Sequence, residues 1–89
     1  MDRIISKPKR PFVVDVKAQG HSTVYLRFEN GEERILDLKP WFTGVFEELK
    51  DPDYFRKVRV ADGSIAWPNG QDLAYDMLYY KSSSLTAVR

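Results

Sequence analysis

The sequence of 89 residues contains no cysteine, and histidine occurs only once. The absence of cysteine excludes a disulfide scaffold, a thiolate nucleophile and a cysteine-ligated zinc site. No apolar run approaches the roughly 18 residues that a membrane-spanning helix needs. The first residues are not followed by the apolar stretch of a secretory signal peptide. We therefore expect a cytoplasmic protein that makes no contact with a membrane.

An excess of charge of one sign is also lacking. The chain has 14 lysine and arginine residues against 13 aspartate and glutamate residues, a formal net charge of +1. The first eleven residues differ, because their net charge is +3, from Arg3, Lys7, Lys9 and Arg10 against Asp2. We predict a basic, extended lead-in at residues 1–11. It either aids solubility or serves as an arm that contacts nucleic acid weakly.

Residues 12–38 contain three runs in which apolar and polar side chains alternate, the period of half-buried strands. In the first run Phe12 and Val14 are predicted to face the core, and Val13 is predicted to face the other side. Asn30-Gly31, between the second and third runs, is typical of a tight hairpin with a type I′ turn. This part of the chain therefore predicts a three-stranded antiparallel meander.

The apolar spacing becomes helical over residues 41–49, where Gly44 predicts an interruption of the helix. Asp51-Pro52 is typical of the start of a further helical turn. Asp62-Gly63 predicts a second hairpin, and Asp72 is predicted to cap a short C-terminal helix.

These elements together predict an α+β fold. We expect a mainly antiparallel sheet, with a helical segment between the meander and the second hairpin and a short helix at the C-terminal end. The predicted domain spans residues 12–80, and residues 81–89 are predicted to form a flexible tail.

The side chains that could carry chemistry form no recognisable catalytic or metal-binding pattern. His21 lies in a predicted turn, which is a poor place to position an imidazole for catalysis. Four acidic residues fall within positions 47–53, but their spacing matches no calcium-binding loop. We therefore expect no catalytic residue, no metal site and no cofactor, and we expect that the protein is not an enzyme.

The most unusual stretch is residues 65–73, where a strand ends at Trp67 and a turn over Asn69 precedes Asp72. In one interpretation Trp67 closes the end of the sheet and its indole N–H donates to a backbone carbonyl. In the other, Trp67, Asn69 and Asp72 form an exposed surface for a ligand or a partner. Tyr79 is close in sequence and belongs to the same candidate surface.

The chain resembles a small bacterial family known as domain of unknown function 2442. The matching motifs are Phe28-x-Asn30-Gly31, Asp37-Leu38, Leu49-x-Asp51-Pro52-x-x-Phe55, Ile65-x-Trp67-Pro68-Asn69-Gly70-x-Asp72-Leu73 and Leu78-Tyr79. Tyr75 departs from the pattern, because the family often has proline there. The resemblance implies an α+β fold without an established activity. It also implies a gene that often lies beside one for another short protein, in what resembles a toxin–antitoxin pair.

Our leading hypothesis is a non-enzymatic protein-binding module, the antitoxin-like member of such a two-gene pair. Its expected partner is the product of the adjacent gene or a second copy of the chain. The candidate surfaces are the free edge of the first strand, beside Val13, and the aromatic region around Trp67 and Tyr79.

Two other classes of function remain open from the sequence. One is a nucleic-acid-binding accessory or regulatory protein that uses the basic N-terminal arm of Arg3, Lys7, Lys9 and Arg10. Four basic residues can neutralise only about four phosphates, so we expect this binding to be weak and non-specific. The other is a small-molecule sensor or enzyme with a pocket near Asn69 and Asp72.

Overall fold

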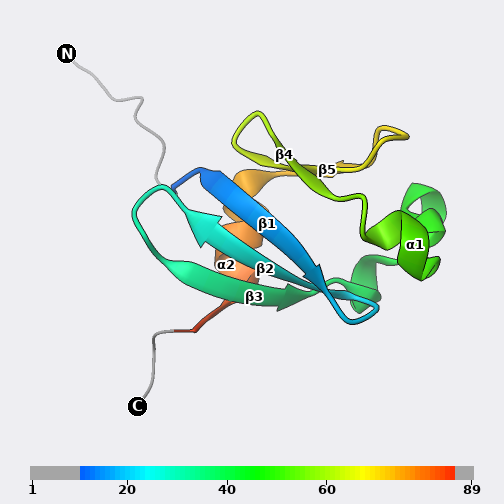
Figure 1. The fold of residues 1–89 in the computed structure, drawn as a ribbon, viewed down its shortest axis with the longest axis horizontal. Coiled ribbons are helices and arrows are strands. Elements are labelled where there is room, and N and C mark those ends of the chain that lie inside the picture. Colours follow the sequence, from blue (N-terminus) through cyan, green and yellow to red (C-terminus); the bar gives the residue numbers. More distant parts are fainter. Residues whose placement is uncertain (1–10, 86–89) are drawn as a thin grey trace.

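The computed structural model describes residues 11–85 (Figure 1). Along the chain the elements are β1 (Val13–Gln19), β2 (Thr23–Phe28), β3 (Glu33–Asp37), the 3-10 helices η1 (Lys39–Trp41) and η2 (Gly44–Lys50), α1 (Pro52–Phe55), β4 (Arg59–Ala61), β5 (Ser64–Ala66), β6 (Asp72–Leu73), α2 (Tyr75–Lys81) and β7 (Ser83–Ser84). The strands form an antiparallel four-stranded sheet in the order β1-β2-β3-β7 and a separate antiparallel three-stranded sheet, β4-β5-β6. The α+β prediction is confirmed.

The core joins the two sheets and the helices. One face of the four-stranded sheet supplies buried side chains from its central strands, and α2 crosses that sheet in Figure 1. Further buried side chains come from the small sheet, η2, α1, α2 and the residues beside η1. The largest side chains with less than 2% exposure are those of Trp67, Phe28, Phe55, Leu26, Leu38, Leu49, Ile65 and Leu78. Burying this apolar surface is the main favourable contribution to folding.

The two predicted hairpins are present, but their turns differ. Asp62 and Gly63 both have positive φ, 52° and 79°, as a type I′ turn requires. At the first hairpin Gly31 has a φ of 90°, whereas Asn30 is not in the positive-φ region. The Asn30 side chain instead accepts a hydrogen bond from the Glu32 N–H at 3.0 Å. The predicted type I′ turn is therefore wrong at this position, and a longer loop replaces it.

Val13 is buried, so the prediction that it faces away from the core is wrong. Its exposure is 2%, against 38% for Phe12 and 44% for Val14. The register of β1 against β2 shifts between Val13 and Asp15, which leaves Val14 as an extra residue. Such a bulge reverses the alternation of faces on either side of it, and a pattern read from sequence alone does not reveal the shift.

The N-terminal end of β1 does not present a free backbone edge for another strand. The Val13 N–H donates to the carbonyl of Gly63 at 2.8 Å, and β1 contacts both β4 and β5. Strand addition at this edge, which the sequence hypothesis placed beside Val13, would have to displace the second hairpin.

The segment after α2 also differs from the prediction. Ser82 is buried, and Arg34 donates to its hydroxyl at 2.7 Å and to its carbonyl at 2.8 Å. β7 pairs with β3, and the Leu85 N–H donates to the Glu33 carbonyl at 2.9 Å. Residues 82–85 therefore belong to the folded part, because they satisfy backbone groups at an edge of β3.

The helical segments follow their local signals only in part. η1 ends at Trp41 and η2 begins at Gly44, which has a φ of 58°, so the predicted interruption of the helical segment is confirmed next to Gly44. Asp51 caps α1 by accepting from the Asp53 N–H, as predicted. Asp72, however, is not a helix cap. It lies in β6, and α2 begins at Tyr75 after Ala74, because pairing with β5 holds this segment extended.

The burial of Val13 generates a stability prediction. Val13→Lys places a charged side chain in the buried core and should lower the free energy of unfolding by about 3 kcal/mol or more. Val14→Lys, one residue along on the exposed face, should cost less than about 1 kcal/mol. Chemical denaturation of both variants measures the difference. Equal midpoints for the two would contradict the register described here.

Candidate functional site: a groove on the small sheet

Strand register determines which side chains share the outer face of the small sheet. Arg59 lies opposite Ala66, and Ala66 lies opposite Asp72. Because directly opposed residues point to the same side of a sheet, these three form one row across the strands. Ala61 and Ser64 are likewise opposed and form a second row. The other face of β5 carries Ile65, which is fully buried in the core.

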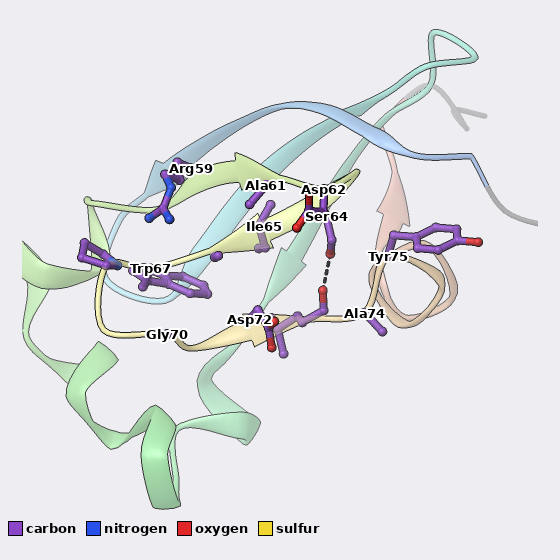
Figure 2. Close-up of a pocket in the computed structure, with 13 residues that line it drawn as sticks. Arg59, Ala61, Asp62, Ser64, Ile65, Trp67, Gly70, Asp72, Ala74 and Tyr75 are labelled. Carbon is purple, nitrogen blue, oxygen red and sulfur yellow. Dashed lines mark hydrogen bonds between the residues drawn. The ribbon is translucent and has the colours of Figure 1, made fainter.

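A groove of about 420 Å³ runs along this outer face (Figure 2). Its floor is made of small side chains on the three strands and the segments that follow them: Ala61, Ser64, Ala66, Gly70 and Ala74. Trp67 lies toward one end in Figure 2 and Tyr75 at the other. Small side chains on a central strand between longer ones produce a concave surface that another chain can enter.

Charges of opposite sign border the groove. Arg59 projects from the β4 side and Asp72 from the β6 side, and both are exposed. Within residues 11–85 neither of them forms an ion pair. The strands that carry them are two strand spacings apart, about 9.5 Å. Asp62, in the turn between β4 and β5, adds a second carboxylate to the lining. The groove therefore presents a guanidinium on one side and carboxylates on the other.

Trp67 has a structural role. Its exposure is 1%, and its indole N–H donates to the carbonyl of Phe55 at 2.9 Å. Its ring stacks on that of Phe55, with centroids 6.0 Å apart and planes at 29°. The interpretation in which Trp67 closes the end of the sheet and finds a backbone partner is confirmed. The interpretation that exposes the ring is wrong.

Asn69 belongs to a network that we call the polar clasp, defined by Glu48, Tyr54, Asn69 and Gln71. The carboxylate of Glu48 accepts from Asn69 Nδ2 at 2.7 Å and from Gln71 Nε2 at 2.9 Å. The Tyr54 hydroxyl donates to Gln71 Oε1 at 2.6 Å and accepts from the Asn69 N–H at 2.8 Å. The clasp holds the loop between β5 and β6 against η2 and α1.

The sequence reasoning missed Gln71, although its side chain is 6% exposed and also donates to the Val45 carbonyl at 3.0 Å. A glutamine in a turn carries no periodic signal. Its contact with Glu48 joins positions 23 apart in the chain. The clasp also lowers the pKa of Glu48 from its ordinary value of 4.5, because Asn69 first and Gln71 second donate to the ionised carboxylate.

The other predicted site residues lie away from the groove. Tyr79 packs its ring edge-on against Phe28, with centroids 5.3 Å apart, and the Arg34 guanidinium lies 4.5 Å from the centre of the Tyr79 ring. Val13 is in the core. Of the predicted binding residues, the groove thus brings together Trp67 and Asp72. The basic residues Arg3, Lys7, Lys9 and Arg10 lie outside the described residues.

Among the residues that the structure describes, no group of three or more potential ligands is placed to hold a metal ion. No helix in that part of the chain is long and apolar enough to cross a membrane.

The polar clasp predicts a pH dependence of stability. Because the pKa of Glu48 is lowered by folding, its ionised form stabilises the fold above the unfolded-state pKa. That contribution is lost as the pH falls through the lower folded-state value. Glu48→Gln cannot accept from both amides, so it should melt below the wild type at pH 7. The gap in melting temperature should narrow as the pH falls below 4.5 and through the lower folded-state pKa of Glu48.

Thermal unfolding between pH 3 and 7 measures this gap. Glu47→Gln is the matched control, because Glu47 contacts Lys50 at 3.5 Å and lies outside the clasp. A constant gap between wild type and Glu48→Gln across this pH range would contradict the role assigned to the clasp.

Comparison with known proteins places the chain in a family. No curated protein and no solved structure shows a significant match to the chain. The model of one protein family matches residues 13–84, which spans the described strands and helices from β1 through β7. That family is described as a protein of unknown function, and the chain belongs to it: it is a member of the DUF2442 family.

Proposed function

We propose that the protein is a non-enzymatic protein-binding module and that the groove on the small sheet receives a segment of its partner. The observation that carries the proposal is the pair Arg59 and Asp72, two exposed and opposite charges on either side of the small floor residue Ala66. Within the described part of the chain no ion pair neutralises them. A partner that supplies the complementary charges gains both affinity and a defined orientation.

The surroundings of the groove support this use. Trp67 and the polar clasp hold the loop at one end of the groove through buried or charge-assisted hydrogen bonds. A site that is ordered before the partner arrives loses less conformational entropy on binding.

The proposed partner is the product of the adjacent gene, with this protein as the antitoxin-like member of the pair. This part of the proposal rests on what the family resemblance implies, a gene that lies beside that of another short protein.

The test fills the floor of the groove. Ala66→Leu places a branched side chain between Arg59 and Asp72 and should weaken binding of the adjacent gene's product by tenfold or more. Gln19→Leu, on the exposed face of β1, is the matched control and should bind as the wild type does. Calorimetry measures the affinity of the wild type and of each variant for the product of the adjacent gene.

Thermal unfolding of the free variants accompanies the binding measurement. If Ala66→Leu destabilises the fold, Ala61→Arg replaces it, because Ala61 lines the same groove and is less buried. Wild-type affinity in a folded groove variant would refute the groove as the binding site.

A further inference from the structure

β6 is an edge strand, and its outward backbone groups are available. The Trp67 N–H donates to the Gln71 carbonyl at 2.9 Å, so residues 67 and 71 form a hydrogen-bonded pair. Such pairs alternate with non-bonded ones along an antiparallel ladder. Asp72, opposite Ala66, is therefore in a non-bonded pair, and its N–H and C=O point away from β5.

The backbone N–H of Ala74 adds one hydrogen-bond donor to this open edge. Its N–H points to the same side as that of Asp72, since the two residues are two apart in an extended segment. Within residues 11–85 the Ala74 N–H donates to no acceptor. Toward the other end, the side chain of Gln71 is bound to the Val45 carbonyl at 3.0 Å, so η2 limits the edge there. The open edge thus runs from Asp72 to Ala74.

The side chains beside this edge define what an added strand would meet. On the outer face Asp72 stands between Gly70 and Ala74, two residues away on either side. A residue directly opposite Asp72 would lie against an exposed carboxylate, where a basic side chain is favoured and an acidic one is disfavoured. Its neighbours two residues away would lie beside Gly70 and Ala74, where bulky side chains have room.

We infer that the partner segment joins the small sheet as a fourth strand beside β6, with a lysine or arginine opposite Asp72. The inference rests on the proposed function and specifies the partner: an extended, basic peptide segment. Its backbone lies beside β6 in the plane of the sheet, and its side chain opposite Asp72 lies on the groove face. Few backbone bonds are available along so short an edge, so the charge pair supplies much of the specificity.

The backbone part of the inference is tested with Ala74→Pro. Ala74 has a φ of −70° and follows an extended residue, so proline fits without strain and removes only the N–H. Ala74→Ser is the matched control, because it keeps the N–H. The probe is a set of short linear peptides selected from a random display library on the immobilised full-length protein.

Selected peptides should bind Ala74→Pro about tenfold more weakly than Ala74→Ser, because the loss follows the N–H and not the change of side chain. Both variants should melt within a few degrees of the wild type. Wild-type affinity of the peptides for a folded Ala74→Pro would overturn strand addition, and so would the recovery of no peptide.

The charge part is tested by reversal. Selected peptides should be enriched in lysine and arginine, and Asp72→Lys should bind them about tenfold more weakly. Replacing the enriched basic residue of the peptide with glutamate should restore binding to Asp72→Lys. Glu47→Lys, an equal reversal on exposed η2, should change nothing. Failure of the glutamate peptide to recover affinity overturns the pairing with Asp72.

Failure of the inference is distinguishable from failure of the proposed function. If Ala66→Leu abolishes binding of the adjacent gene's product while Ala74→Pro leaves it intact, the groove is the site but strand addition is wrong. If Ala66→Leu has no effect on that binding, the groove itself is not the site.

Discussion

The hydrogen bond from the Trp67 indole to the Phe55 carbonyl is the interaction on which the remaining arrangement depends. The Phe55 carbonyl, in the last turn of α1, accepts this hydrogen bond at 2.9 Å and a longer one from the Val58 N–H at 3.3 Å. It also fixes the largest buried side chain of the molecule against that helix. The small sheet is thereby attached to the 3-10 and α-helical segment, and the polar clasp fastens the following loop to the same segment. The groove takes its shape from this attachment.

The parts of the fold that follow from local chemistry could be predicted from the sequence. Asp51-Pro52 starts a helix because a carboxylate accepts a free N–H there, and Asp62-Gly63 reverses the chain because both residues adopt positive φ. The bulge at Val14 could not be predicted, since it depends on how β1 registers against β2. The strand at residues 83–84 likewise exists only because β3 presents an edge to it.

The candidate site could be located only in part. Trp67 and Asp72 belong to a run whose residue types are unusual enough to draw attention. Arg59 and Ala66 do not, because an arginine on a short strand and an alanine in its neighbour have no distinctive pattern. They become a site when the register of β4 and β5 sets them side by side. Asn69 is exposed and its side chain donates to Glu48, a contact between positions 21 apart that no local pattern predicts.

The most direct test of this account is chemical denaturation of Trp67→Phe, which keeps an aromatic ring and removes the indole donor. Trp41→Phe is the control, because Trp41 is the other tryptophan and is only partly buried. The account predicts that Trp67→Phe lowers the free energy of unfolding by about 2–4 kcal/mol, because the indole hydrogen bond is lost and the smaller ring leaves a cavity. Trp41→Phe should cost less than about 1 kcal/mol. Equal denaturation midpoints for Trp67→Phe and the wild type would contradict it.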